Sequence, residues 1–231
     1  RDETKARVAL IDANMEFGDV GVFLNLPNSR TMAEMAGEKT EIDEDILEGT
    51  LASHASGIKV LLAPSRPEMA ELVKVDHLKK IIELMSKSFD YIVVDLWKSY
   101  HETTILFLDA ADQIILVSTS DIPAIKNAKL FFELTEALRY PPSKTIFVLN
   151  KEDGRSGIRP KDIEASIKHP VSNLLPKDDR TTTLAINRGV PFVIAQRNVA
   201  LSQAYYLLAR TTVQRLAAEK APAAPASAGN R

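Results

Sequence analysis

Two short apolar runs in this sequence each end in an aspartate, and carboxylates placed in this way can hold a metal ion. The runs are Val8-Ala-Leu-Ile-Asp12 and Tyr91-Ile-Val-Val-Asp95. A buried strand that stops at a carboxylate brings that charge to the carboxyl edge of its sheet, where open α/β folds bind ligands. Two carboxylates at one edge repel each other unless a cation or a hydrogen-bond network intervenes. We therefore predict a magnesium site at Asp12 and Asp95. The alternative is that each acid only caps the helix after its strand.

The segment Phe89–Asp95 has the form of a Walker B strand, in which an apolar run precedes an acid. Such an acid orients water on a magnesium ion that is held by nucleotide phosphates. No glycine-rich phosphate loop occurs anywhere between Arg1 and Arg231. The sequence therefore contains only half of a nucleotide site.

A third apolar run ends in Val148-Leu-Asn150-Lys151-Glu-Asp153, which fits the Asn-Lys-x-Asp pattern of many GTPases. The amide of Asn150 can contact a purine edge, and the carboxylate of Asp153 can accept hydrogen bonds from guanine. The alternative is a polar turn that follows a strand. Position at the carboxyl end of a strand favours nucleotide contact.

Other kinds of site find little support. The four histidines have no zinc-ligand spacing, no serine lies in a Gly-x-Ser-x-Gly elbow, and there is no cysteine. We expect the basic pair Lys79-Lys80 and the trio Arg155, Arg159 and Lys161 to be solvated faces. We expect Trp97 to pack over the sheet edge.

The elements that must position these residues alternate along the chain. Apolar helical stripes, such as Leu78, Ile82, Met85 and Phe89, or Ile125, Ala128, Phe132 and Leu134, separate short apolar runs that read as strands. This alternation predicts an α/β fold, a mostly parallel sheet with helices on both faces. The predicted strands are Arg7–Asp12, Ile58–Ala63, Tyr91–Asp95, Gln113–Ser118, Thr145–Asn150 and Val171–Leu175.

Composition indicates one ordinary globular domain. The chain has 231 residues, of which 45% are hydrophobic and 26% charged, with a formal charge of −2. No run is long enough to span a membrane. We predict a domain over residues 1–220 and a disordered Ala/Pro tail over 221–231. A last helix is expected to begin near Asn198 and to run to about Lys220, with Leu201, Tyr205, Leu208 and Val213 on its inner face. Asn28–Ser56 is expected to be an acidic insertion with one or two short helices.

Four ordered phrases resemble a known family. Together they are similar to ParA/MinD-type ATPases of the SIMIBI class of P-loop NTPases, in particular the CpaE/TadZ branch, and the resemblance runs from Arg7 to about Leu216. The phrases are Leu10–Val20, Phe89–Leu96, Leu108–Asn127 and Ala185–Pro191.

The resemblance implies roles for individual residues. Asp12 matches the first acid of the family's Asp-x-Asp switch, and Asp95 matches the Walker B acid; both belong to the magnesium shell. Asn14 stands where the family has the acid that positions the attacking water, which puts hydrolysis in doubt, because an amide is neither a base nor an anion. The implied adenine contacts, which stand in place of guanine recognition, are Asn150, Lys151, Pro176, Lys177 and Asp178.

The resemblance also implies that the first strand and the Walker A loop are missing from this chain. ATP and Mg²⁺ are then expected cofactors of the full-length protein, with weak or no binding by this chain. Loss of that strand would leave unpaired strand edges near Asp12 and Asp95.

The implied function is an ATP-binding spatial organiser for type IV (Flp/Tad-type) pilus or secretion machinery. It would form a nucleotide-dependent homodimer, lie in the cytoplasm, and be recruited to a cell pole or the inner membrane by partner proteins. The formal charge of −2 argues against DNA binding. A non-hydrolysing scaffold of the same fold is the alternative, and a GTPase is a third, weaker one.

Overall fold

The computed structural model describes residues 4–27, 30–37 and 41–220. These residues form two compact units, which we describe one at a time. The first unit contains the described residues up to Ala111 together with Arg180–Ala195. The second contains Asp112–Asp179 and the described residues from Gln196 onward.

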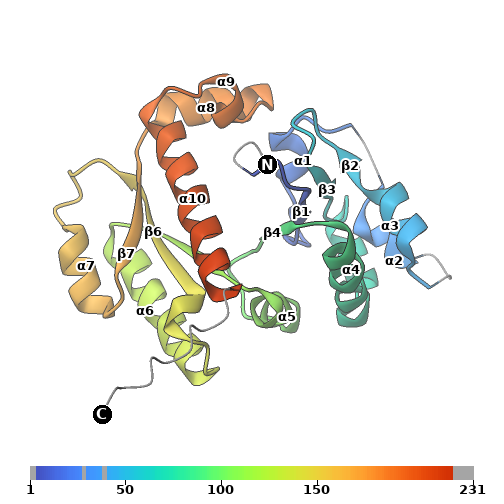
Figure 1. The fold of residues 1–231 in the computed structure, drawn as a ribbon, viewed down its shortest axis with the longest axis horizontal. Helices are drawn as coiled ribbons and strands as arrows, with labels where there is room; N and C mark the ends of the chain where they lie inside the picture. Colours follow the sequence, from blue (N-terminus) through green and yellow to red (C-terminus); the bar gives the residue numbers. More distant parts are fainter. Residues whose placement is uncertain (1–3, 28–29, 38–40, 221–231) are drawn as a thin grey trace, which may run out of the picture. The chain divides into compact units, whose positions relative to one another are not determined.

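The first unit is built on a four-stranded sheet with the order β2-β3-β1-β4 (Figure 1). Strands β3 and β4 flank β1 in parallel, and the two-residue β2 is antiparallel to β3. The strands are β1 (Val8–Asp12), β2 (Ala52–Ser53), β3 (Lys59–Leu61) and β4 (Tyr91–Asp95). The helices are α1 (Val20–Phe23), α2 (Met32–Gly37), α3 (Glu44–Thr50), η1 (Pro67–Leu72), α4 (Val75–Ser88), α5 (Glu102–Ala110), α8 (Asp179–Arg188) and α9 (Phe192–Ala195).

Alternation along β1 places apolar side chains on both faces of this sheet. Ala9 and Ile11 pack into the main core, with side chains from α2, α3, α4 and α5. Leu10 faces the other way and packs with Val20 and Val60. Helices therefore cover both faces, as expected for parallel strands.

An ion pair fixes the register where β1 and β4 begin. The Arg7 guanidinium lies 2.7 Å from Asp90 Oδ1, and the Arg7 backbone N–H donates to Asp90 Oδ2 at 2.7 Å. In return, the backbone N–H of Asp90 donates to the Arg7 carbonyl at 2.9 Å. Because the two strands start in register, they also end in register.

The second unit is built on a parallel three-stranded sheet with the order β5-β6-β7. Phe147 and Leu149 of β6 pack with α6 and α7 on one face, and Ile146 and Val148 pack with Leu208 of α10 on the other. Its elements are β5 (Ile114–Thr119), α6 (Ile122–Ala137), η2 (Pro142–Lys144), β6 (Thr145–Glu152), α7 (Pro160–Ile167), β7 (Val171–Pro176) and α10 (Ala200–Lys220).

The predicted α/β class with parallel strands is confirmed, and all six predicted strands exist within a few residues of their expected bounds. The structure adds the short antiparallel β2, which alternation within a buried run could not indicate. The last helix begins at Ala200, close to the expected start near Asn198, and Leu201 and Leu208 are buried as expected. The predicted tail, residues 221–231, lies outside the described residues.

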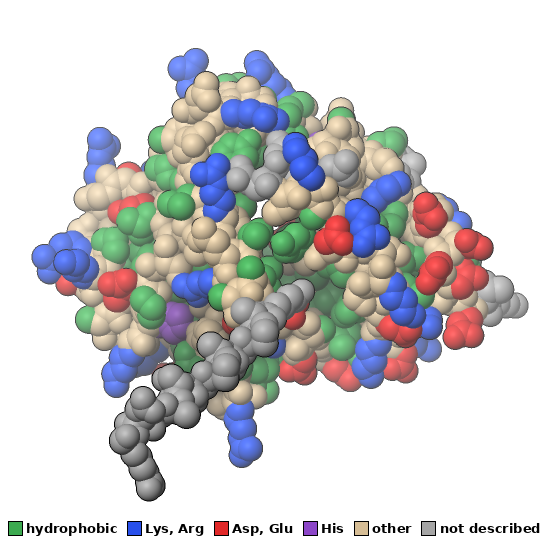
Figure 2. Space-filling view, in the orientation of Figure 1, with side chains coloured by type: hydrophobic (Ala, Val, Ile, Leu, Met, Phe, Trp, Pro, Cys, Tyr) green, Lys and Arg blue, Asp and Glu red, His purple; other side chains and the backbone are tan. Residues whose placement is uncertain are grey.

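The acidic segment contains the short helices α2 and α3, as expected. Figure 2 shows Asp and Glu side chains gathered over this part of the molecule, and α3 carries Glu44 and Asp45 in its first turn. Met32 of α2 and Leu47 of α3 are buried and pack in the main core. The segment is therefore a packed part of the first unit.

Of the two unpaired strand edges that were predicted, near Asp12 and near Asp95, one is present. Strand β1 has partners on both sides, so the expectation of an unpaired edge at Asp12 is wrong. Strand β4 ends its sheet, and no strand within the described residues pairs with its far side. Its central residue Val93 is 52% exposed, although the strand is as apolar as a strand covered on both sides.

Candidate functional site

The two aspartates that end β1 and β4 are register partners on neighbouring parallel strands. The backbone N–H of Ala13 donates to the Asp95 carbonyl at 2.9 Å and continues the pairing beyond the strands. Asp12 is buried, with 1% of its surface exposed, whereas Asp95 is open to solvent. The predicted juxtaposition of Asp12 and Asp95 at one sheet edge is therefore present.

The turn after β1 folds back over the Asp12 carboxylate. Its oxygens accept hydrogen bonds from the backbone N–H groups of Asn14 and Val20, both at 3.2 Å. Only glycine fits at position 18, because an added Cβ would lie 2.6 Å from Asp12 Oδ2 and 2.4 Å from the Ala63 Cβ. Gly18 thus lets the backbone approach the carboxylate closely enough for Val20 to donate.

Burial raises the pKa of Asp12 from its ordinary value, although the two backbone N–H donors oppose this, and the charges of Asp95 and Asp19 raise it further. Although Asp95 is more exposed than Asp12, partial desolvation raises its pKa too, with a smaller contribution from the Asp19 charge. The ionised forms of the two acids are therefore destabilised in the folded protein, and a bound cation would stabilise them.

The donor set at this edge suits a magnesium ion better than a metal with a full protein shell. No group of three His, Cys, Asp or Glu side chains in the described residues could hold a metal. Magnesium is commonly held by one or two carboxylates, with water and phosphate oxygens as its other ligands. Asp12 and Asp95 fit that role.

Asn14 is engaged with its own loop. Its Nδ2 donates to the Phe17 carbonyl at 2.6 Å, and its Oδ1 accepts from the Phe17 N–H at 3.3 Å. Both polar atoms of the side chain therefore bind one residue three positions later. This closed loop presents Phe17 to solvent, with 66% of its surface exposed.

Trp97 does not pack as predicted. Its surface is 52% exposed, and Tyr100 in the same loop is 58% exposed. The Lys98 ammonium lies 5.9 Å from the Trp97 ring centroid. The indole therefore does not pack over the sheet edge.

In the second unit, the predicted base-contacting residues lie in the last residues of β6 and β7 and directly after β7. Asn150 Oδ1 accepts a hydrogen bond from the Lys151 backbone N–H at 2.9 Å, which leaves its Nδ2 as the donor for a ligand. Strand β6 continues to Glu152, and Lys151 has a left-handed φ of 55°. The Lys177 N–H donates to the Glu152 carbonyl at 3.0 Å, so the two strand ends are tied together.

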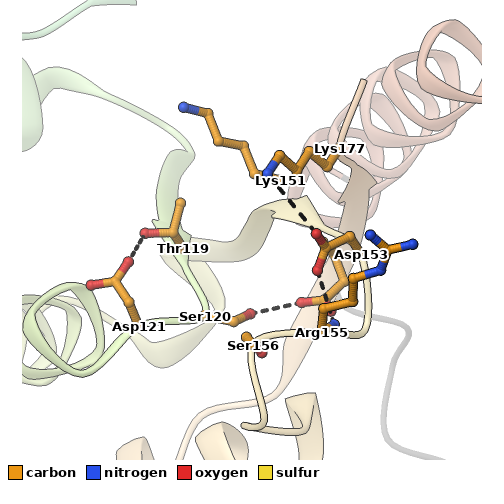
Figure 3. A pocket seen from close by; sticks show the side chains of 9 residues that line it. Thr119, Ser120, Asp121, Lys151, Asp153, Arg155, Ser156 and Lys177 are labelled. Carbon is orange, nitrogen blue, oxygen red and sulfur yellow. Dashed lines mark hydrogen bonds and ion pairs between the residues drawn. The ribbon is translucent and has the colours of Figure 1, made fainter. Parts of the chain in front are cut away.

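A cavity of about 470 Å³ lies at the carboxyl ends of the three strands of this unit (Figure 3). Of the predicted site residues, Lys151 and Lys177 line it, whereas Asn150, Pro176 and Asp178 do not. The residues that sequence reasoning did not assign to the site are Thr119, Ser120, Asp121, Glu152, Arg155 and Ser156. The polar run Ser118–Asp121, which begins in the last two residues of β5, was the available signal, since this strand end meets the same edge.

Asp153 also lines the cavity, and its carboxylate has two neighbours. Oδ1 accepts from the Arg155 backbone N–H at 2.9 Å, and Oδ2 lies 4.0 Å from the Lys177 ammonium. Each oxygen keeps a further acceptor position. Guanine recognition by Asp153 therefore stays a prediction.

The site and fold can be compared with known proteins. No protein-family model matches the chain. An uncharacterized ATP-binding protein of Methanocaldococcus jannaschii is 24% identical over 205 residues, which cover 88% of this chain and 75% of that protein. The septum site-determining protein MinD of Thermotoga maritima is 23% identical over 212 residues, which cover 88% and 76%.

The solved structures with a similar fold include a ParA family ATPase and MinD. The ParA family ATPase of Chlorobium tepidum matches with a TM-score of 0.80 at 21% identity, over 87% of this chain and 84% of that one. MinD of Pyrococcus horikoshii, solved with Mg-ADP, matches with a TM-score of 0.76 at 19% identity, over 95% and 88%. The fold is therefore that of the ParA/MinD-type P-loop NTPases. In sequence, the chain is similar to MinD and to an archaeal ATP-binding protein along most of its length.

No helix within the described residues is both long enough and apolar enough to cross a membrane.

Proposed function

We propose that this chain is the greater part of a ParA/MinD-type ATPase that acts as a spatial organiser and dimerises when it binds nucleotide. The observation that carries the proposal is the pair Asp12 and Asp95, which end neighbouring strands in register. The similarity to MinD and to an archaeal ATP-binding protein supports it.

In this proposal the chain's own residues hold magnesium and the base end of the nucleotide. Asp12 and Asp95 would orient the magnesium ion and its waters, and the ion would neutralise phosphate charge when bound. Asn150, Lys151, Pro176, Lys177 and Asp178 would contact the adenine end. Since Asn150 Oδ1 accepts from the Lys151 N–H, the Asn150 Nδ2 would be the group that donates to the base.

This proposal places the phosphate loop in a segment outside the 231 residues. Two observations support it: the sequence contains no glycine-rich loop, and β4 has an unpaired apolar edge. A strand that carries the loop would pair with that edge and cover Val93. The domain would then consist of that strand and residues 1–220, with 221–231 as a tail.

Nucleotide affinity tests the missing loop. Phosphate-loop amides and lysine supply most of the charge neutralisation on the β- and γ-phosphates. Isothermal titration of residues 1–231 with ATP and magnesium should show no micromolar binding, and the protein extended by the upstream coding sequence should bind. A micromolar dissociation constant for residues 1–231 would refute the missing-loop proposal.

A non-hydrolysing scaffold is the second candidate, and the contacts of Asn14 favour it. An amide carries no charge, and the Nδ2 and Oδ1 of Asn14 each form a hydrogen bond with the Phe17 backbone. The extended protein should then hydrolyse ATP slowly or not at all, and Asn14→Asp should increase turnover. Normal turnover with Asn14 in place would exclude the scaffold.

The partner class follows from the resemblance to the CpaE/TadZ branch. The proposed partners are pilus or secretion assembly proteins that recruit a cytoplasmic dimer to a cell pole or the inner membrane. A fluorescent fusion of the extended protein should form polar foci that disappear with Asp95→Ala. Foci that persist in a strain without pilus genes would exclude a pilus-specific role.

ATP should also be preferred to GTP by the extended protein, because a relative similar to this chain along most of its length is an ATP-binding protein. Competition between the two nucleotides measures this preference.

A further inference from the structure

Asp19 lies in the turn that folds back over the Asp12 carboxylate. The residue before it, Gly18, is so close that an added Cβ would lie 2.6 Å from Asp12 Oδ2. The residue after it, Val20, donates its backbone N–H to the same oxygen at 3.2 Å. Because both of its neighbours in the sequence contact Asp12, the backbone of Asp19 is held beside this carboxylate.

The usual structural role of an aspartate at this position is not used. Asp19 stands at the N-cap of α1, where a side-chain oxygen commonly accepts a hydrogen bond from a backbone N–H of the first turn. Among the described residues, the Asp19 carboxylate has no such bond, no other hydrogen bond and no ion pair, and the residue is exposed. Helix capping therefore does not account for this acid.

The charge of Asp19 acts on both acids of the proposed magnesium site. Desolvation is the main cause that raises the pKa of Asp12 and of Asp95, and the charge of Asp19 raises both further. Glu16, an exposed acid of the same turn, is not among the charges that raise them. Since Asp12 and Asp95 are register partners, Asp19 is a third carboxylate at the end of this strand pair.

The proposed ATPase needs an acid at this edge that Asn14 does not supply. The residue at position 14 would orient the attacking water, but its amide is uncharged and binds the Phe17 backbone through Nδ2 and Oδ1. Hydrogen bonds to an ionised acceptor are about twice as strong as neutral ones, so a carboxylate would hold that water better. A direct metal contact is not the role left for Asp19, because no three such side chains among the described residues could hold a metal.

We propose that Asp19 positions the water that attacks the γ-phosphate, in place of Asn14. This inference rests on the ATPase function proposed above. The Asp19 carboxylate accepts a hydrogen bond from the water, whose oxygen bonds to the γ-phosphorus as the bond from that phosphorus to the bridging oxygen breaks. The departing ADP keeps the electron pair of the broken bond, and the proton of the water passes to solvent. Phosphoryl transfer depends mainly on positioning and charge, so orientation is the expected contribution.

A double-mutant cycle on residues 1–231 tests the place of Asp19 without nucleotide. Asp19→Asn and Asp95→Asn each remove one of two repelling charges, so each should raise the melting temperature at neutral pH in chelator-containing buffer. The second substitution should add clearly less than it does alone, because the repulsion is already gone. Additive shifts would place Asp19 away from Asp95 and overturn the proposal.

Turnover by the protein extended with the upstream coding sequence tests the role of Asp19. Asp19→Asn should lower kcat about a hundredfold and leave the dissociation constant of ATP and the magnesium requirement unchanged. Asn14→Asp in that background should recover part of the loss, because a carboxylate again serves the water. Glu16→Gln is the matched control, since Glu16 is an exposed acid of the same turn, and its kcat should stay that of the wild type. Thermal melting confirms that each variant is folded.

Three results of the turnover experiment would overturn the proposal. An unchanged kcat in Asp19→Asn would show that the acid is not used. A raised magnesium requirement with normal kcat at saturating magnesium would make Asp19 part of the magnesium shell. An extended wild-type protein that binds ATP without hydrolysing it would show that Asp19 does not replace the acid missing at Asn14. Failure of the extended protein to bind ATP at all is a different outcome, because it would refute the ATPase function itself and this inference with it.

Discussion

At the scale of single residues, the chemistry of the first unit depends on how one buried carboxylate is held. Asp12 is buried with two backbone N–H donors, beside Asp95 and Asp19. Such a group costs stability at neutral pH and is typical of sites kept for function. The neighbouring Asn14 has the opposite character, because its two polar atoms stabilise the loop that follows.

Asn14→Asp should destabilise the fold by about 1–2 kcal/mol. The substitution removes the donor to the Phe17 carbonyl and adds negative charge near Asp12 and Asp95. Urea unfolding measures the loss. Asn127→Asp on the exposed side of α6 is the control and should change stability by less than about 0.5 kcal/mol. Unchanged stability of the Asn14 variant would show that the loop does not need the amide.

Asp95→Asn should raise the melting temperature at neutral pH. The pKa of Asp95 is raised in the folded protein, so its charged form is destabilising above that pKa, and the cost disappears as the pH falls toward the unfolded value. The difference between variant and wild type should therefore shrink on acidification. Melting curves from neutral pH to about pH 3 in chelator-containing buffer follow it.

Asp90 lies just before β4, and the substitution Asp90→Asn should have the opposite effect on the melting temperature. The hydrogen-bonded Arg7 side chain lowers the pKa of Asp90, so its charged form stabilises the fold above the unfolded pKa and loses that effect as the pH falls through the lowered pKa. Asp90→Asn should lower the melting temperature at neutral pH. If Asp90→Asn and Asp95→Asn shifted the melting temperature in the same direction, the conclusion that the charge of Asp95 destabilises the fold would be wrong.

At the scale of elements, short segments hold the site through close backbone approach. The turn between β1 and α1 depends on Gly18, and the ends of β6 and β7 are joined by the Lys177 N–H. The sequence predicted the strands and their terminal acids, because apolar runs bounded by polar residues have a strong local signal. It did not predict α1 or the closed Asn14 loop, which have four residues or fewer and no periodicity.

Gly18→Ala should destabilise the protein by about 1–3 kcal/mol, because the added methyl overlaps the Asp12 carboxylate and the Ala63 side chain. Gly49→Ala is the matched control. It lies in α3 with open space around its Cα and should stabilise by about 0.5–1 kcal/mol. Chemical denaturation of both variants checks the pair, and equal effects would contradict the proposed contact.

At the scale of the whole molecule, exposed apolar edges limit how well these 231 residues behave in solution. Strand β4 ends the sheet of the first unit, and β5 ends that of the second, with Val93, Ile115 and Val117 between 41% and 52% exposed. Open apolar edges are templates for pairing with other chains. We expect residues 1–231 to self-associate at concentrations where a protein with covered edges stays monomeric.

Val93→Lys should reduce this self-association, because a charge on an edge strand opposes pairing. Light scattering over a concentration series measures the effect, and Leu130→Lys on the exposed face of α6 is the control for added charge. A wild-type chain that is monomeric and melts at high temperature would count against a missing strand at β4.

The sequence by itself determined the α/β class, the parallel strands and the aspartates that end two of them, because hydrophobic periodicity and terminal polar residues are local properties. Only the tertiary structure showed that Asp12 is buried under its own loop, that Asn14 is bound to Phe17, and that Lys151 and Lys177 line one cavity. These features depend on contacts between strand ends and loops, and such distances are set by packing and not by the order of residues along the chain.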